Sequence, residues 1–434
     1  MSPKEKKRKL RSSEIGSPSL PKIDVKKKKK KVSKSLITTS PSHSEKDLVI
    51  PSPSLISKVN VGIAMSKQND VAMFLTEKVI SAVATNSNFV FSPTSINSVL
   101  TMVAASSKDE TLRSSIVSFL RSYSIDELNA VFSEVAANVL VDGSTSGGPK
   151  IAAVNGVWME QSLVVDPLLK DLFENFFKAS FSLVDFQFKA EEVREEVNAW
   201  ASKHTNGLIK NILPPRSVTR DTHSVYGNAL YFKGTWEQKF PKFLTRDKKF
   251  HLLSGTSVSV PFMSNKSTRQ YIEKYNGFKV LKLPFRQSGD ITRQFSMYFY
   301  LPDAKDGLTP LVKKMASCTR GFLDLHTPTK QVQVGQFRIP KFKIDFGFEA
   351  SSALNGLDLV SVSLYHKALV EVDEDGALGA AVTVVSCGGG GRGQNTRKID
   401  FVADHPFLFM IREDKTGTVL FVGQMFDPSK SSSA

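Results

Sequence analysis

The chain is poor in cysteine and has no long apolar run. Only two of its 434 residues are cysteines, Cys318 and Cys387, too few for the disulfide framework of small secreted domains. No stretch approaches the roughly 18 consecutive apolar residues that cross a bilayer. The opening MSPKEKKRK also lacks the apolar region of a secretory signal. We therefore expect an intracellular protein, in the nucleus or the cytoplasm or both, that is not secreted and does not contact a membrane.

The signatures of common enzymes are missing too. The seven histidines are scattered, with no His-Glu-x-x-His or Cys-x-x-Cys metal pattern, and no Gly-x-Ser-x-Gly elbow holds a nucleophile. Asp404 and His405 are adjacent, but no serine is placed to complete a triad with them, and a histidine before Pro406 is more often structural. The sequence thus predicts no catalysis, no metal and no cofactor.

The excess of basic over acidic residues is concentrated at the N-terminus. Residues 1–58 contain 14 Lys and 2 Arg against 3 Glu and 2 Asp, a balance of +11 out of +16 for the whole chain. The segment is rich in Ser, Pro and Lys and has almost no aromatic residues. It cannot bury enough apolar surface to offset the entropy of ordering, so we expect a disordered basic tail over residues 1–58.

Two basic clusters stand in this tail. KEKKRKLR runs from Lys4 to Arg11, and six consecutive lysines run from Lys26 to Lys31. Such clusters are typical of nuclear localisation signals, here of the bipartite kind, or of phosphate contacts with nucleic acid. The expected partners are a nuclear import receptor or nucleic acid. A tail that only improves solubility is the alternative.

A glycine-rich stretch near the C-terminus, residues 371–398, reads EVDEDGALGAAVTVVSCGGGGRGQNTRK. Its glycine run opposes regular structure, because glycine loses more backbone entropy on ordering than any other residue. No Gly-Lys-Ser/Thr follows, so the run is not a phosphate-binding loop. YHKALVEV precedes it, and FVADHPFLFMIREDKTGTVLFVGQ follows as two apolar runs around a turn, which predicts a hairpin. Taken alone, the stretch is a surface loop between strands.

Helical and strand patterns alternate through the rest of residues 59–428. VAMFLTEKVISAV has helical spacing, NFVFSPTSINSVLTM predicts a strand, a Ser-Pro cap and a helix, and EEVREEVNAWASKHTNGLIK predicts a helix ended by Asn-Gly. Strand patterns such as VNGVWME, NALYFKGTW and FSMYFYLP are interspersed with these helices. The pattern predicts an α+β protein with sizeable sheets.

The order and wording of these motifs resemble the serpins, and FVADHPFLF…GTVLFVGQ resembles plant serpins in particular. The resemblance implies the serpin fold as a single domain over residues 59–428, with a short C-terminal tail at 429–434. It implies a large mixed central β-sheet, two further sheets, about eight or nine helices, and an exposed reactive-centre loop at about residues 374–398.

The resemblance also implies a function. A serpin is a suicide-substrate inhibitor of serine or papain-like cysteine endopeptidases, and we expect this one to be a monomer. The protease cleaves the loop and forms an acyl-enzyme, and the N-terminal part of the loop then inserts into the large sheet before the ester hydrolyses. Residues matching the hinge of that loop are Glu374, Gly376, Ala377, Gly379, Ala380 and Ala381.

Insertion requires that the side chains pointing beneath the sheet be small and uncharged. If Gly376 is the family's hinge glycine, strand alternation gives an inward set with no charge and nothing larger than Val. Its members are Ala377, Gly379, Ala381, Thr383, Val385, Cys387 and Gly389. The family pattern at the hinge is Gly-Thr-Glu followed by alanines. Ala377, Leu378 and Val382 depart from it, but Leu378 and Val382, like Val384, belong to the outward set, which tolerates bulk.

Two scissile bonds remain open. Family spacing from the hinge glycine reaches Gly390–Gly391, which we prefer slightly. Side-chain chemistry favours Arg392–Gly393, because a glycine offers a protease pocket nothing to bind, whereas Arg392 would recruit an Arg-specific enzyme.

Six further residues, which are distant from the scissile bond in sequence, match positions where the family's main sheet opens. By motif, Ser92, Ser95, Asn228 and His366 resemble the polar cluster under the centre of the main sheet. Trp236 resembles the aromatic residue at the point of first insertion, and Lys341 resembles the ion-pair partner of Glu374. Ordinary core polarity or surface pairing is the alternative for each.

Two other functions are compatible with the sequence. One is a non-inhibitory nuclear serpin that binds chromatin or nucleic acid through its basic tail. The other is a serpin that proteases cut as a plain substrate, because its glycine-rich loop inserts too slowly. The small inward residues favour inhibition, whereas the tail fits either function.

Overall fold

The computed structural model describes residues 51, 53–265, 269–287, 289, 291–318, 321–354, 356–357, 359, 362–377 and 398–430. The expectations for the basic tail, including Lys4 to Arg11 and Lys26 to Lys31, lie outside these residues. So do those for residues 378–397, which include both candidate scissile bonds.

The described residues form nine α-helices and five short helical turns. The α-helices are α1 (Pro53–Ile56), α2 (Val61–Val83), α3 (Pro93–Ser106), α4 (Glu110–Phe119), α5 (Ile125–Glu134), α6 (Pro167–Asp171), α7 (Phe186–His204), α8 (Leu308–Ser317) and α9 (Phe322–Leu325). The short turns are Val135–Val139 and Leu172–Phe176, both π-helical, and Ser144–Ser146, Lys242–Leu244 and Ser351–Ala353, all 3-10.

Sixteen strands complete the described secondary structure. They are β1 (Phe89–Phe91), β2 (Lys150–Glu160), β3 (Ala179–Val184), β4 (Ser224–Thr235), β5 (Arg246–His251), β6 (Ser257–Met263), β7 (Arg269–Tyr275), β8 (Phe278–Pro284), β9 (Phe295–Pro302), β10 (Gln331–Pro340), β11 (Phe342–Glu349), β12 (Val362–Val372), β13 (Gly376–Ala377), β14 (Ile399–Val402), β15 (Phe407–Glu413) and β16 (Val419–Met425).

These strands build two sheets. The first has six strands in the order β11-β12-β13-β4-β2-β3, and it is mixed, because β12 is parallel to β4 and β2 is parallel to β3. The second has ten strands. The two further sheets expected from the sequence share β10, which pairs with β7 at one end and β6 at the other, so hydrogen bonds join them into one. The α+β class with a large mixed sheet is confirmed.

Local sequence explains where the main helices begin and end. The helix predicted from Val71 begins ten residues earlier, because Asn60 caps it by accepting the N–H of Ile63. Ser92 caps α3 as predicted by accepting the N–H of Ser95, with Pro93 in the first turn. The Asn-Gly pair after α7 adopts positive φ at both residues, which ends the helix.

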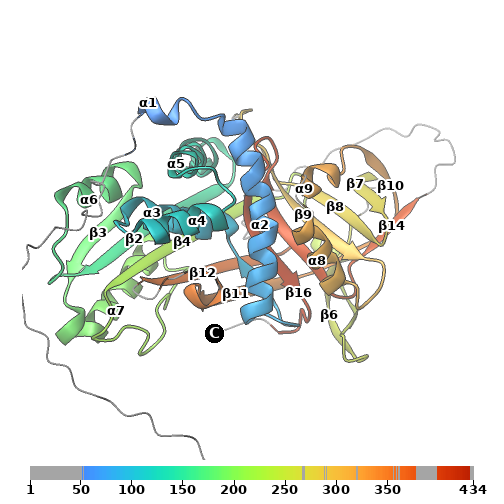
Figure 1. The fold of residues 1–434 in the computed structure, drawn as a ribbon. Coiled ribbons are helices and arrows are strands. Elements are labelled where there is room, and N and C mark those ends of the chain that lie inside the picture. Colours follow the sequence, from blue (N-terminus) through green and yellow to red (C-terminus); the bar gives the residue numbers. More distant parts are fainter. Residues whose placement is uncertain are drawn as a thin grey trace, which may run out of the picture. The chain divides into compact units, whose positions relative to one another are not determined.

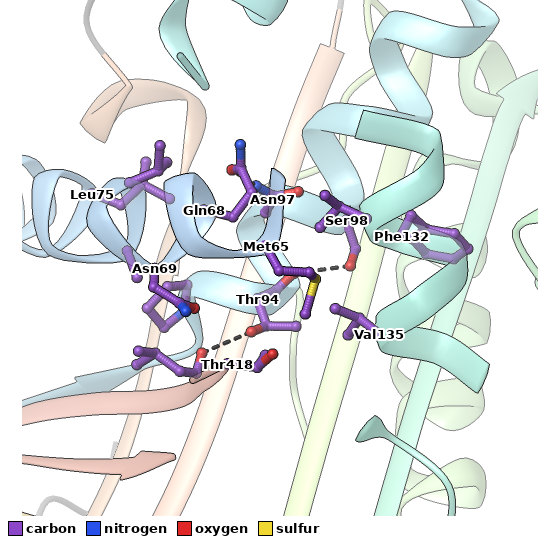
Figure 2. A pocket seen from close by; sticks show the side chains of 15 residues that line it. Met65, Gln68, Asn69, Leu75, Thr94, Asn97, Ser98, Phe132, Val135 and Thr418 are labelled. Carbon is purple, nitrogen blue, oxygen red and sulfur yellow. Dashed lines mark hydrogen bonds between the residues drawn. The ribbon is translucent and has the colours of Figure 1, made fainter. Parts of the chain in front are cut away.

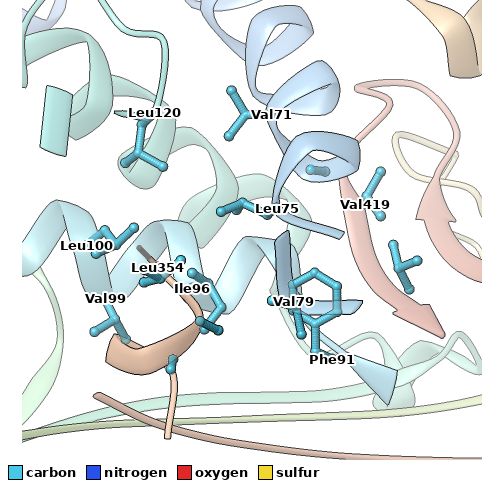
Figure 3. Close-up of a cluster of buried hydrophobic side chains, with 14 of the residues drawn as sticks. Val71, Leu75, Val79, Phe91, Ile96, Val99, Leu100, Leu120, Leu354 and Val419 are labelled. Carbon is cyan, nitrogen blue, oxygen red and sulfur yellow. The ribbon is translucent and has the colours of Figure 1, made fainter. Parts of the chain in front are cut away.

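The six-stranded sheet is covered on both faces. Val157 of β2 belongs to the core under α2, α3 and α4, whereas the next residue, Trp158, packs with Val193 and Val197 of α7 on the other face. Figure 1 shows α7 on the opposite side of this sheet from α3, α4 and α5. In Figure 3, α2 and α3 interlock over Phe91 with fully apolar side chains. Opening this sheet therefore disturbs two packed layers.

None of the described helices is both long enough and apolar enough to cross a bilayer.

Candidate functional site

The candidate site is the place where the glycine-rich stretch leaves the six-stranded sheet. Strands β12 and β4 are parallel neighbours from Val362↔Ser224 to Ala368↔Leu230. Beyond that point β13 lies between them and is antiparallel to both. The first residues of the stretch thus already occupy a strand position at the end of the sheet.

Gly376 makes this position possible. It pairs with Thr235, and a Cβ on it would lie 2.0 Å from the carbonyl oxygen of Gly234. No side chain fits there without moving β4, so the close approach requires glycine. The next residue, Ala377, is in register with Val372 of β12 and Gly234 of β4. Val372, the β12 partner of this position, is buried in the core.

Trp236 holds the segment that precedes β13. The indole is 2% exposed and stacks on Phe285 with ring centroids 4.8 Å apart. Its Nε1–H donates to the carbonyl of Asp373 (2.9 Å), and its backbone N–H donates to the carbonyl of Asp375 (3.0 Å). The motif-matched tryptophan therefore lies where loop and sheet meet.

Glu374 and Lys341 form the expected ion pair. Lys341 Nζ lies 2.7 Å from one carboxylate oxygen of Glu374, and the Thr245 hydroxyl donates to the other oxygen at 2.7 Å. Burial favours the protonated acid, but these two hydrogen bonds outweigh it and lower the pKa of Glu374 below its ordinary value. Sequence reasoning missed Thr245.

A second ion pair, also not foreseen, follows immediately. The carboxylate of Asp375 lies 3.0 Å from Lys239 Nζ and 3.3 Å from Lys242 Nζ. Burial again favours the acid, and the two ammonium groups reverse the effect, so the pKa of Asp375 is lowered. The Asp-Glu-Asp run around Glu374 was the available signal, because adjacent carboxylates repel one another and are stabilised by nearby cations.

Three of the four residues of the motif-matched polar cluster are linked by hydrogen bonds. The backbone N–H of Ser92 donates to Nε2 of His366 at 3.0 Å, and the N–H of Ser95 donates to the Ser92 hydroxyl. His366 is 1% exposed and packs edge-on against Phe91 and Phe348. Burial lowers the pKa of His366 to about 3, so the ring is neutral at physiological pH.

Asn228, the fourth member, lies directly opposite His366 across the β4–β12 pairing. Its Nδ2 donates to Oδ1 of Asn155 on β2 at 2.6 Å. Among the described residues, neither Asn228 Oδ1 nor His366 Nδ1 has a hydrogen-bond partner. The sheet centre therefore holds one unpaired acceptor and one unpaired ring nitrogen on neighbouring strands, both buried. Asn155 was also missed, although an Asn within a buried strand was a visible signal.

Two hollows lie near this cluster. One of about 150 Å³ is lined by Ser95, Asn155, Asn228 and Lys178 among others, so it places polar groups under β2 and β4. Figure 2 shows the other, of about 30 Å³, between α2, α3 and α5. There Asn97 donates to Gln68, and Thr94 donates to the carbonyl of Val419. It has room for one or two waters and no nucleophile–base pair.

Asp404 and His405 have a structural role. Nδ1 of His405 lies 2.8 Å from the Asp404 carboxylate, and Nε2 lies 2.8 Å from the carbonyl oxygen of Pro302. Both ring nitrogens are thus occupied, and within the described residues no serine hydroxyl bonds to either. No group of three or more His, Cys, Asp or Glu side chains in that part of the chain is arranged to hold a metal ion.

The remaining predicted site residues lie outside the described residues. These are Gly379, Ala380 and Ala381 of the hinge and the candidate scissile residues Gly390, Gly391, Arg392 and Gly393.

This chain is similar in sequence and fold to known proteins. The family model for serpins (serine protease inhibitors) matches residues 66–428. A "Probable non-inhibitory serpin-Z5" of Arabidopsis thaliana is 63% identical over 438 residues, covering 99% of this chain and all of that protein. Serpin-Z2 of the same plant is 62% identical over 379 residues, covering 87% of this chain and 92% of that protein. The solved structure of Arabidopsis AtSerpin1 in its native stressed conformation is 46% identical, with a TM-score of 0.78, and covers 86% of this chain and all of that one.

Proposed function

Because the chain belongs to the serpin family, we propose that it is a suicide-substrate inhibitor of serine or papain-like cysteine endopeptidases. In this mechanism the protease's serine hydroxyl or cysteine thiol attacks the scissile carbonyl of the loop. The amine of the C-terminal fragment leaves, and an ester or thioester joins the loop to the protease. Inhibition requires that the loop insert into the sheet before water hydrolyses this bond.

The observation that carries the proposal is the register of β13. If the cleaved loop continued in the pairing set by Gly376 and Ala377, residues 377–387 would run antiparallel along the full length of β12. The same continuation along β4 ends at Ser224, where that strand begins. Both pairings place Cys387 opposite the first residue of the strand, so the segment before the glycine run has the length of the gap.

The side chains also suit this register. Continued pairing places Gly379 and Ala381 beside Val370 and Ala368, which are buried in the core. An inserted strand would gain two antiparallel ladders in place of one shorter parallel pairing. At roughly 1 kcal/mol net per hydrogen bond, about ten bonds give of order 10 kcal/mol, against about 2–3 kcal/mol for the glycines. Insertion is therefore favourable in free energy.

Either candidate bond lies just beyond the paired segment. Gly390–Gly391 and Arg392–Gly393 both follow Cys387 by a few residues, so cleavage at either one frees residues 377–387 to insert. The structure does not favour one bond over the other, and we keep both as candidates.

The test is to mix the full chain with a trypsin-like and a papain-like protease and to analyse the products on a denaturing gel. Inhibition predicts a protease–serpin band that survives SDS, and sequencing the released peptide will show whether it begins at Gly391 or Gly393. Ala381→Glu would bury a charge under the sheet and should convert the protein into a plain substrate. Leu378→Glu, in the outward set, is the matched control and should still form the band. Cleavage without any such band, for both protease classes, would refute inhibition.

A second candidate function is a non-inhibitory nuclear serpin that binds chromatin or nucleic acid through its tail. The description of its 63% identical relative as probably non-inhibitory favours it, since that similarity spans 99% of this chain. We also propose that the protein is monomeric and resides in the nucleus and/or the cytoplasm through the clusters Lys4 to Arg11 and Lys26 to Lys31. A fluorescent fusion should leave the nucleus when both clusters are changed to alanine. Salt-sensitive DNA binding lost in the same variant would support the second function.

A further inference from the structure

A basic pocket of about 290 Å³ lies between β5, β6 and β10. Three of the residues that line it are cations, Arg246, Lys248 and Arg338, whereas Phe262 and Phe337, which also border it, are almost fully buried in the core. None of its lining residues is acidic. The pocket thus presents concentrated positive charge, which suits an anionic group on a partner.

Strand alternation explains why the cations gather there. Along β5, Arg246 and Lys248 are two residues apart and line the pocket. Asp247 and Lys249, which alternate with them, do not line it. The side of β5 that lines the pocket therefore contributes only cations to it. The acid that would neutralise it, Asp247, is on the other face.

The three cations have no acidic partner among the described residues. Within the described part of the chain, none of the three forms an ion pair with a carboxylate. Arg246 donates to the carbonyl of Thr245 at 2.8 Å, and Arg338 donates to the side chain of Gln336. Two acids on adjoining segments hydrogen-bond to other groups than these cations. Asp400 accepts the N–H of Gln336 at 2.7 Å, and Glu374 is held by Lys341 and Thr245.

The pocket lies beside both ends of the loop. Thr245, adjacent to Arg246, donates to Glu374 just before β13, where the loop leaves the sheet. Arg338 pairs with Val402 of β14, where the chain re-enters the ten-stranded sheet. A protease that engages the loop between these two points would bring part of its surface close to the pocket.

We propose that this pocket, which we call the basic exosite, receives an acidic side chain of an endopeptidase docked on the loop. The proposal rests on the proposed function, because it assumes that proteases attack the loop. A carboxylate there would accept charge-assisted hydrogen bonds from Arg246 and Arg338 and lie close to Lys248. Long-range attraction would also raise the association rate of proteases with acidic surfaces.

The test uses anionic and cationic trypsin, two probes with the same active-site chemistry and opposite surface charge. The rate constant for loop cleavage is measured with the full chain, the double variant Arg246→Glu/Lys248→Glu, and Lys249→Glu at low and high salt. Lys249 is the control, because it carries the same charge on the same strand but lies outside the pocket. Its reversal changes the net charge by two, half the change in the double variant, so a general charge effect predicts a loss for the double variant equal to the square of the control's loss. The basic tail is present in all three proteins and cancels in the comparison.

The exosite predicts that the double variant lowers the rate for anionic trypsin by about tenfold at low salt and leaves cationic trypsin unchanged or faster. Lys249→Glu should change both rates by less than about twofold, and high salt should remove the difference between variants. A loss in the double variant no larger than the square of the loss in Lys249→Glu, at matched thermal stability, would overturn the exosite. So would loss of duplex-DNA binding in the double variant with no change in the trypsin rates. The rate constant for cleavage can be measured whether or not trypsin stays trapped. Failure of inhibition is therefore seen separately, as the absence of an SDS-stable band.

Discussion

At the scale of single residues, His366 shows how the sheet centre depends on a neutral ring. Its Nε2 accepts the N–H of Ser92, so in the neutral tautomer the proton lies on Nδ1. Protonating Nε2 would set a donor against a donor in a fully buried site. Independently of that clash, burial disfavours the charged ring and lowers the pKa of His366 to about 3 from an ordinary 6.5.

The shifted pKa makes stability depend on pH. Above pH 6.5 both folded and unfolded chains hold a neutral ring, and the contribution is fully present. As the pH falls from 6.5 toward 3, only the unfolded chain takes up the proton, so folding should lose about 1.4 kcal/mol per pH unit from this residue. The free energy of unfolding, measured by urea titration at pH 7.5, 6.5, 5.5 and 4.5, gives the loss. His366→Gln should be less stable at pH 7.5 but flatter with pH. Parallel curves for the two proteins would contradict the assignment, since other carboxylates titrate equally in both.

A loop residue is expected to satisfy the unpaired groups beside this ring. Continued β13 register would place Thr383 between Asn228 and His366. Its hydroxyl could donate to Asn228 Oδ1 and accept from His366 Nδ1–H, the two atoms that lack partners among the described residues. Thr383→Val keeps the shape of the side chain and removes both bonds, so the loop-cleaved form should lose about 1–3 kcal/mol while the intact form is unchanged. Thermal unfolding of both forms measures this, with Val384→Thr as control. An equal effect on the intact form would refute the register.

At the scale of secondary-structure elements, the proposed inhibitory function makes β13 the point where insertion begins and Gly376 the residue that allows it. Gly376→Val would place a branched side chain against the Gly234 carbonyl, which already lies 2.0 Å from an ideal Cβ. The hinge segment should then leave the gap between β12 and β4, and cleavage should release the protease. We expect at least a tenfold increase in the ratio of cleaved serpin to SDS-stable complex, measured by gel densitometry. Gly62→Ala, with nothing nearer than 3.7 Å, is the control. Unchanged partitioning would show that β13 has no part in insertion.

Most elements were predictable because their signals are local. The Ser-Pro cap of α3, the Asn-Gly end of α7 and the terminal hairpin depend on a few neighbouring residues, and each forms where expected. Motif resemblance also located His366 and Lys341. Asn155 and Thr245 were missed because register alone brings them to the site. Asn155 is 73 residues from Asn228, and Thr245 is 129 residues from Glu374. Contacts of that kind follow from strand pairing, which periodicity does not specify.

At the scale of the whole molecule, the described structure combines two opposing features. The six-stranded sheet has a packed layer on each face, which resists separation of β12 from β4. Yet the β4–β12 pairing is parallel and covers seven positions, whereas an inserted strand would add antiparallel partners along all of β12. Under the proposed inhibitory function, a barrier separates the present pairing from a more favourable one, and cleavage of the loop would allow the change.

Cleavage should therefore make the protein more stable. About 10 kcal/mol of added pairing corresponds to a rise of about 10–20 °C in the unfolding temperature of a domain this large. Circular dichroism of the intact chain and of the chain cut within the loop measures it, with Ala381→Glu, which blocks insertion, as the matched variant. Under the inhibitory function the wild type gains and the variant does not. If the protein is a non-inhibitory serpin whose loop stays outside the sheet, cleavage should raise the unfolding temperature of neither the wild type nor the variant, because the cleaved ends would add no strand pairing. The unfolding temperature after cleavage thus separates the two functions without knowledge of the target protease.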